Sequence, residues 1–219
     1  MGNKLNKIES YISDIIQGEK EVFINGEHYN EMGRQTRKKI LEIAAEIGTG
    51  VFAEAGACMG TDTKLLEECG WTGILIEPSE GLFEFCKRTR KCIVENYALV
   101  SSDYDSDYIS EIPVFKINHI LPDYPLNSGK YNATTFNKLV EKHDLKKIDI
   151  FVLDAEGLEQ EIIKGINFEK IEITNFIIEC NIDQTSKESL DTFMLSYGYL
   201  NHGVAEHLGT GFYDYHYKK

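Results

Sequence analysis

From residue 51 onward, short apolar segments alternate with amphipathic segments, and this order constrains the fold more than any other feature. The apolar segments are VFAEAGA, GILIEP, CIVENYALV, DIFVLDAEG and NFIIECN. Helical patterns stand between and after them, in TDTKLLEECG, SEGLFEFCKRTR, LEQEIIKGI and KESLDTFMLSYG. Strands that alternate with helices indicate β-α units around a mostly parallel sheet. Because the strands are almost continuously apolar, we expect an α/β fold of Rossmann-like type with helices on both faces.

The two ends of the chain add elements to this core. Helical periodicity over residues 3–17 and 34–47 predicts an N-terminal helical appendage at 1–48, followed by the main domain at 49–219. The C-terminal segment GTGFYDYHYKK reads as a last strand, antiparallel and at the end of the sheet.

One long connection interrupts the alternation. Residues 101–131 contain three of the four prolines, and long connections inside compact domains are usually functional or disordered. Two interpretations stay open. One is a solvated surface loop with an edge strand at 112–117, and the other is a variable loop that acts as a substrate lid.

Composition limits the classes of partner. The 219 residues include 36 acidic and 23 basic side chains, which gives a net charge of −13. A field of this sign repels phosphate backbones and anionic lipids, so we expect neither a nucleic acid nor a membrane as partner. No apolar stretch has signal-peptide character or the roughly 18 residues of a membrane span. The odd number of cysteines, five, without a Cys-x-x-Cys pair, favours reduced thiols and a cytoplasmic location.

The first apolar segment ends in a glycine-rich turn, Glu54-Ala55-Gly56-Ala57-Cys58-Met59-Gly60. Glycine allows a sharp turn and a close approach of the backbone to a ligand. Dinucleotide-binding enzymes have G-x-G-x-x-G here, which cradles a pyrophosphate. In this chain Glu54 stands at the first glycine position. A carboxylate repels a pyrophosphate and attracts an ammonium or sulfonium group, so the turn favours S-adenosylmethionine over NAD.

Polar residues also end the later apolar segments. Glu77 ends GILIEP about twenty residues after the turn, where an acid accepts hydrogen bonds from ribose hydroxyls. Asn96 follows the third strand, where residues often contact the adenosine. Asp154 ends the fourth strand, with Glu156 two residues on, and Glu179 ends the next strand. Such a cluster of acids needs a cation, a proton or ligand hydroxyls to relieve its repulsion.

These motifs, in this order and spacing, resemble the FkbM-type methyltransferases. The resemblance covers roughly residues 50–100 and 132–200, including GWTGILIEP, NYAL, DAEGLE and IIECN. It implies a class I methyltransferase fold, whose seven-stranded sheet has one antiparallel strand, and a cofactor, S-adenosylmethionine. By position, it implies that Glu54, Gly56, Ala57 and Gly60 line the methionine end, that Glu77 holds the ribose, that Asn96 lies near the adenosine, and that Asp154, Glu156 and Glu159 form the D-x-E-G-x-E motif. Thr61-Asp62-Thr63 departs from the family, which often has Ser-Asn-Thr here.

The resemblance also implies O-methylation of a sugar, a glycan or a small natural product. A hydroxyl must lose its proton as it attacks, and Asp154 is the expected base, oriented by Glu156. Alternatively, Mg²⁺ bound by Asp154, Glu156 and Glu179 acidifies the hydroxyl. An NAD-dependent oxidoreductase and a non-catalytic relative of the same fold remain alternative functions. The acceptor itself and the oligomeric state are not encoded in any motif.

Overall fold

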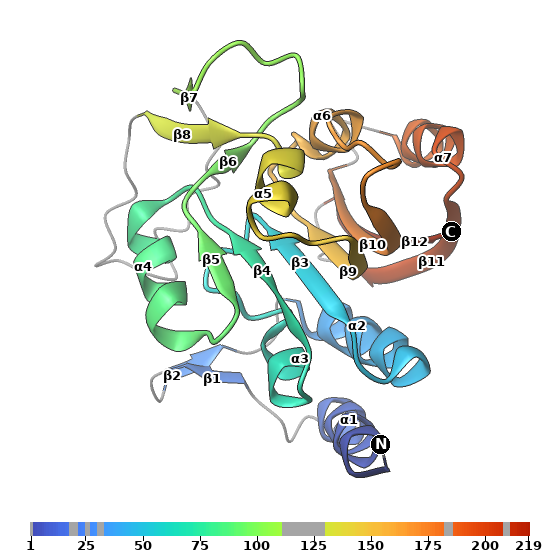
Figure 1. The fold of residues 1–219 in the computed structure, drawn as a ribbon. Coiled ribbons are helices and arrows are strands. Elements are labelled where there is room, and N and C mark those ends of the chain that lie inside the picture. The colour runs from blue at the N-terminus through green and yellow to red at the C-terminus, as the bar shows by residue number, and fades with distance from the viewer. Residues whose placement is uncertain are drawn as a thin grey trace.

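The computed structural model has a central sheet of seven strands in the order β11-β12-β10-β9-β3-β4-β5 (Figure 1). The structure describes residues 2–17, 22–24, 27–29, 33–110, 130–181, 186–207 and 211–219. The strands of the sheet are β3 (Val51–Ala55), β4 (Thr72–Ile76), β5 (Ile93–Glu95), β9 (Lys147–Leu153), β10 (Glu172–Asn181), β11 (Leu200–His207) and β12 (Phe212–Lys218). The helices are α1 (Gly2–Gln17), α2 (Arg34–Ile47), α3 (Lys64–Glu68), α4 (Glu80–Thr89), α5 (Phe136–Lys142), α6 (Glu159–Lys164) and α7 (Lys187–Ser196).

The direction of the strands confirms the predicted fold class. β10, β9, β3, β4 and β5 run parallel to one another. β12 is antiparallel to both β10 and β11, so it is the single reversed strand. The carboxyl ends of the parallel strands therefore share one edge, and the loops after these strands meet there.

Helices cover both faces of the sheet and form a separate apolar core on each. Side chains alternate along a strand, so Phe151 and Leu153 of β9 enter one core and Ile150 and Val152 enter the other. The first core contains buried residues of α5, α6 and α7. The second contains buried residues of α1, α2, α3 and α4. The nearly continuous apolar strands follow from this burial on both faces.

The C-terminal strand does not lie where the sequence analysis places it. β12 is antiparallel, as expected, but it lies between β10 and β11, and the end of the sheet is β11. β11 is mostly exposed, and its pairing with β12 shifts register twice. An edge strand in contact with solvent needs no run of apolar residues. For this reason residues 200–207 give no strand signal in the sequence.

The N-terminal helices α1 and α2 lie where their periodicity predicts them. Ile8 of α1 and Ile40 of α2 are fully buried in the same core as Phe52 of β3. The two helices therefore cover part of one sheet face. The division of the chain at residues 48 and 49 stays a prediction.

Two small sheets complete the described part of the chain. β1 (Val22–Ile24) pairs with β2 (Glu27–Tyr29), and β8 (Tyr131–Thr134) lies between β6 (Ala98–Leu99) and β7 (Tyr108–Ile109). The predicted edge strand at 112–117, and most of the predicted lid, lie outside the described residues.

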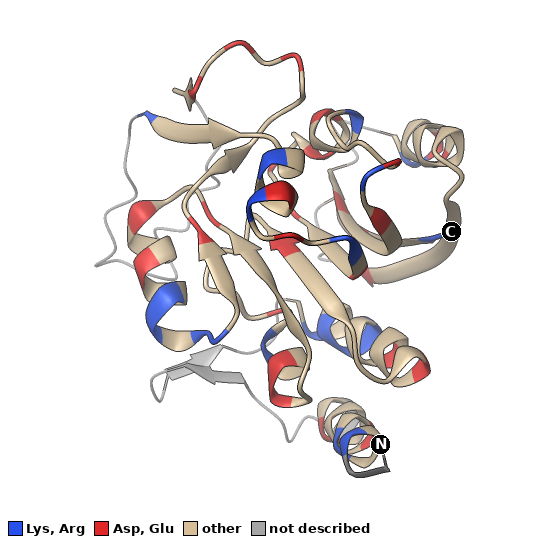
Figure 2. Ribbon diagram, in the orientation of Figure 1, with Lys and Arg blue, Asp and Glu red and all other residues tan. Residues whose placement is uncertain are grey.

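Charged residues lie on the surface helices, and the cysteines are free thiols. Acidic and basic residues occur together on surface helices such as α2, α4 and α5 (Figure 2). The five cysteines all lie in the described segments, and none of them forms a disulfide. Within those segments no helix has the length and apolar character needed to cross a bilayer.

Candidate active site at the carboxyl edge of the sheet

The turn after β3 is tied to both neighbouring strands. The backbone N–H groups of Gly56 and Ala57 donate to the carbonyl oxygen of Ile76 at 3.0 and 3.2 Å. Asp154 in turn donates its N–H to the carbonyl oxygen of Ala55 at 3.1 Å. Gly56 has a φ of 72°, and a Cβ atom there would overlap the carbonyl oxygen of Asp154. Glycine is therefore required where the turn passes the end of β9.

Glu77 lies under this turn, directly after β4. Its buried carboxylate accepts hydrogen bonds from the backbone N–H groups of Cys58 at 2.7 Å and Ser79 at 2.8 Å. Burial raises the pKa of Glu77 to about 7, although these two hydrogen bonds act in the opposite direction. Asn96, which was expected near the adenosine, donates its side-chain amide to the carbonyl oxygens of Glu77 and Pro78 at 2.9 and 3.0 Å. Asn96 thus fixes the segment that carries Glu77.

Glu54 points from β3 toward the core that contains α3 and α4, and it is 4% exposed. One carboxylate oxygen accepts hydrogen bonds from the backbone N–H of Thr63, at 3.2 Å, and from the hydroxyl of Thr63. Arg90 lies 3.9 Å from the same oxygen. Burial raises the pKa of Glu54 to about 7, the charge of Asp62 adds to this effect, and Arg90 opposes it. Asp62, at the position where the family pattern differs, forms an ion pair with Arg37 of α2 at 3.2 Å.

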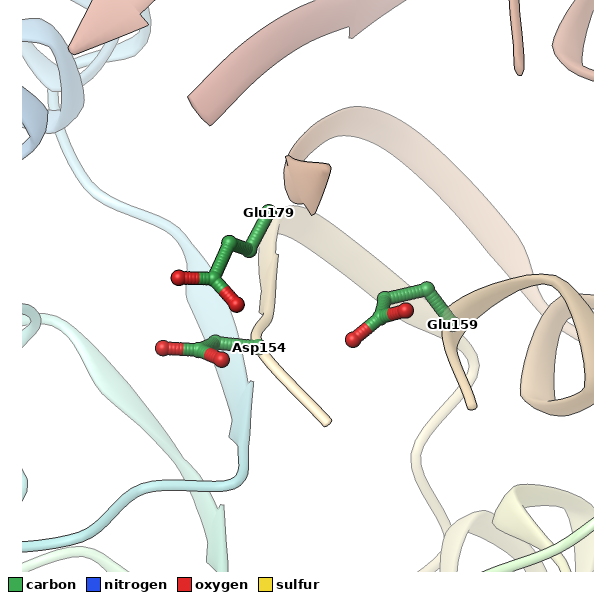
Figure 3. A group of neighbouring side chains, drawn as sticks. All are labelled: Asp154, Glu159 and Glu179. Carbon is green, nitrogen blue, oxygen red and sulfur yellow. The ribbon is translucent and has the colours of Figure 1, made fainter. Parts of the chain in front are cut away.

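Three carboxylates lie close together beside the turn at Gly56: Asp154, Glu159 and Glu179. Figure 3 shows them directed toward a common region from the end of β9, from α6 and from β10. One oxygen of each lies within 4.8 Å of the others, which is close enough for the three to contact one cation. Glu159 also accepts hydrogen bonds from the N–H groups of Ala155 and Gly157 at 2.8 and 3.0 Å, so its position is fixed by the loop.

Glu156 is not a member of this group, although the sequence analysis places it there with Asp154 and Glu179. That expectation requires β9 to continue for two residues beyond Asp154, whereas β9 ends at Leu153. Glu156 has a φ of 54°, which turns the chain out of the extended direction. Glu159, one helical turn later, takes the expected position.

Burial raises the pKa values of the acids in and beside this group, and the charges of neighbouring acids raise several of them further. Burial raises the pKa of Asp154 well above its ordinary value, and the neighbouring charges of Glu179 and Glu156 raise it further. Burial, followed by the charges of Glu179 and Glu159, raises the pKa of Glu156 to about 7. Burial also raises the pKa of Glu179 to about 7, although a hydrogen bond with Asp154 acts in the opposite direction. Such a cluster can accept a proton at neutral pH, and it can bind hydroxyl groups or a cation.

The row of acids continues across the antiparallel strands. Glu179 lies opposite Asp214 of β12, and Asp214 lies opposite Glu206 of β11. Thr36, in the first turn of α2, donates its N–H to Glu206 at 2.9 Å and its hydroxyl to Asp214. Asp214, Glu206 and Arg90 belong to no motif in the sequence that points to the site. The first two become site neighbours only through the pairing of β12 between β10 and β11.

Comparisons with known proteins identify the family of the chain and its fold. Residues 51–200 match the family model described as the methyltransferase FkbM domain. A proposed RNA methyltransferase from Pyrococcus horikoshii is similar in structure, with a TM-score of 0.51 and 13% identity over 97% of this chain and 96% of that one. Magnesium protoporphyrin IX methyltransferase from Synechocystis PCC 6803, solved with bound SAM, is also similar in structure. Its TM-score is 0.50, and its sequence identity is 12% over 99% of this chain and 97% of that one. At these low identities the structural similarity shows a shared fold alone. No curated protein matches the sequence significantly.

Proposed function

Because the chain belongs to the FkbM family of methyltransferases, we propose that it transfers the methyl group of S-adenosylmethionine to a hydroxyl oxygen. The observation that carries the proposal is the position of Glu77, fixed by two backbone N–H groups beneath the turn at Gly56. A buried acid at the end of the second parallel strand, next to a glycine turn, suits the hydroxyls of a ribose. The Synechocystis enzyme, which has the same fold and is 12% identical to this chain, was solved with SAM bound, and this agrees with the proposed cofactor.

The proposed cofactor contacts follow the carboxyl edge of β3, β4, β5 and β9. Glu54 would face the ammonium of the methionine moiety, because opposite charges attract strongly where water is excluded. The glycine turn would follow the backbone of the ligand, and Asn96 would support Glu77. The proposed cofactor residues are Glu54, Gly56, Ala57, Gly60, Glu77, Asn96 and Asp154.

Methyl transfer would proceed by in-line displacement at the sulfonium carbon. The acceptor oxygen forms a bond to the methyl carbon as the carbon–sulfur bond breaks, and S-adenosylhomocysteine leaves as a neutral thioether. The hydroxyl proton passes to a carboxylate, for which Asp154 is the proposed base. Glu156 and Glu179 raise its proton affinity through their charges.

The acceptor class is proposed from charge and chemistry. Carboxyl and carboxylate oxygens in Asp154, Glu159 and Glu179 suit neighbouring hydroxyls of a sugar, a glycan or another polyhydroxylated natural product. The net charge of −13 disfavours a nucleic acid. Alternatively, the same three carboxylates would bind Mg²⁺, since hard cations prefer oxygen ligands. The proposed base mechanism requires no metal.

Calorimetric titration of the whole chain tests the cofactor, with S-adenosylmethionine, S-adenosylhomocysteine and NAD as separate ligands. We expect micromolar binding of the two sulfur compounds and none of NAD. A panel of sugars and polyols, with S-adenosylhomocysteine formation as the readout, then tests the acceptor, with EDTA and with added Mg²⁺ in parallel. Binding of NAD alone would contradict the proposal, and loss of turnover in EDTA with recovery in Mg²⁺ would replace the base mechanism by a metal mechanism.

A further inference from the structure

A buried arginine at the end of α4 contacts the loop that follows the glycine turn. The side chain of Arg90 has no exposed surface. Its Nη1 donates to the carbonyl oxygen of Gly60, its Nη2 donates to the hydroxyl of Thr63 at 2.9 Å, and its Nε lies 3.2 Å from a carboxylate oxygen of Glu67. The guanidinium also lies over the ring of Phe52, 5.7 Å from its centroid. The Arg90 side chain thus contacts the loop after the glycine turn, α3 and β3.

The position of Arg90 leaves no space for a side chain at Gly60. A Cβ atom at residue 60 would lie 2.6 Å from Nη1 of Arg90 and 2.8 Å from a methyl carbon of Leu75. Glycine at this position therefore leaves space for the guanidinium. The second glycine of the motif contributes to the site through Arg90 as well as through its own backbone.

The contacts of Arg90 converge on Glu54. Thr63 accepts from Arg90 and donates to Glu54, and Arg90 itself lies 3.9 Å from that carboxylate. Two acids, Asp62 and Glu77, also interact with Glu54 electrostatically. The thiols of Cys58, Cys86 and Cys92 have raised pKa values, chiefly through burial, and are neutral at pH 7. In this environment Arg90 is the cation that favours ionised Glu54, because a neighbouring positive charge stabilises the anion.

We propose that Arg90 is a positioning residue for the cofactor: it fixes the loop from Gly60 to Thr63 and favours the anionic form of Glu54, which attracts the methionine ammonium. This inference rests on the proposed function, because it assigns Glu54 to the amino end of S-adenosylmethionine. Arg90 itself touches no reacting atom.

The test compares two ligands that differ at the amino end. S-adenosylhomocysteine carries the amino acid group, whereas 5′-methylthioadenosine shares the adenosine and sulfur but lacks the ammonium. Calorimetry of the wild type, Arg90→Met and Arg90→Lys gives the ratio of the two dissociation constants for each protein. Lys87→Met is the matched control, because Lys87 is an exposed cation on the same helix.

We expect Arg90→Met to weaken S-adenosylhomocysteine binding at least tenfold more than 5′-methylthioadenosine binding. Arg90→Lys should restore part of this difference, and Lys87→Met should match the wild type. In the wild type the preference for S-adenosylhomocysteine should fall below about pH 7, where Glu54 takes up a proton. Without Arg90 the proton affinity of Glu54 rises, so the fall should begin about one pH unit higher.

Equal weakening of both ligands in Arg90→Met, without a shift of the pH profile, would reduce Arg90 to general structural support and overturn the inference. If Arg90→Met does not fold, the same ratio is measured for Arg90→Lys and for Thr63→Val, which removes the hydroxyl between Arg90 and Glu54. An unchanged ratio in both would also overturn it. A wild type that binds neither ligand would overturn the proposed function itself, which distinguishes the two failures.

Discussion

At the scale of single residues, the acids at the carboxyl edge differ in their partners, and the partners suggest different roles. Glu77 has two backbone N–H donors, Glu54 has Thr63 and Arg90, and Asp154 has other acids as neighbours. A carboxylate with fixed donors is held in one orientation, which suits ligand binding. A carboxyl group surrounded by acids has a high proton affinity, which suits proton transfer.

Replacing Glu77 by alanine removes the proposed acceptor of the ribose hydroxyls. We expect the dissociation constant of S-adenosylmethionine to rise at least tenfold, since hydrogen bonds to a charged group contribute about 1.5 to 3 kcal/mol each. Calorimetry at pH 8, where Glu77 is mostly ionised, measures the change. Glu84→Ala, which removes an exposed acid of α4, serves as the control. Unchanged affinity in Glu77→Ala would remove Glu77 from the cofactor site.

Replacing Asp154 by asparagine keeps the shape of the side chain and removes its capacity to take a proton. We expect turnover to fall at least 100-fold, as is typical for loss of a general base, and cofactor affinity to fall far less than turnover. Steady-state rates and calorimetry on the same preparation separate the two effects. Asp144→Asn, at an exposed position after α5, should leave both unchanged. Full turnover in Asp154→Asn would assign proton removal to another group.

At the scale of elements, the site depends on a close passage between the turn after β3 and the end of β9. Gly56 has no space for a side chain because the carbonyl of Asp154 lies against it. The same passage places Asp154 beside the turn, so the element that would hold the cofactor and the proposed base are positioned together.

The Gly56→Ala variant tests this passage. Because the new methyl group overlaps backbone, we expect a loss of at least about 3 kcal/mol in unfolding free energy, at the upper end for single substitutions. Gly48→Ala is the matched control: Gly48 also has a positive φ, 92°, but a Cβ there meets no atom within 4 Å. Backbone strain alone, at a φ of 92° and a ψ of −73°, should cost it roughly 1 to 3 kcal/mol. Equal losses in denaturant titrations of the two variants would show that strain, not the close passage, determines the effect.

The elements also show what the sequence can and cannot predict. The gathering of Glu54, Glu77, Asp154 and Glu179 at one edge was predictable, because parallel topology brings the carboxyl ends of the strands together. Glu179 does not end its strand as expected, because β10 continues to Asn181. β11 was not, because an exposed edge strand has no apolar pattern. Glu159 replaced Glu156 because the chain turns at Glu156 itself. Arg90 was not predictable, because its role arises from the packing of α4 against the loop and leaves no local pattern.

At the scale of the whole molecule, many buried acids combine with an overall charge of −13. Glu54, Glu77, Glu156, Glu179 and Asp214 all have pKa values raised to about 7, with burial as the first cause. Ionising them costs free energy in the folded protein that the unfolded chain does not lose. The ligand-free fold therefore stores unfavourable electrostatic energy at the edge where a cationic or hydroxyl-rich ligand would bind.

This charge distribution predicts how stability depends on pH. In the unfolded chain these acids titrate near their ordinary values of about 4, so between pH 4.5 and 7 the folded protein binds more protons than the unfolded one. Stability must then fall as the pH rises through this range and level off above pH 7. We expect the melting temperature without ligand to drop by at least about 5 °C from pH 5 to pH 8, equivalent to roughly 2 kcal/mol for a chain of this size. Acids with lowered pKa values, such as Glu67 and Asp191, act in the opposite direction, and their contribution is lost below about pH 4.5.

Calorimetric melting across this range, at constant ionic strength, measures the slope. Adding 0.5 M salt separates surface repulsion from the buried acids, because salt screens exposed charges far more than buried ones. The drop between pH 5 and pH 8 should therefore persist in salt. A melting temperature that rises over this range would mean that the acids at the carboxyl edge are ionised and well paired in the folded protein. In that case proton sharing around Asp154 would no longer explain how a base is available there at neutral pH.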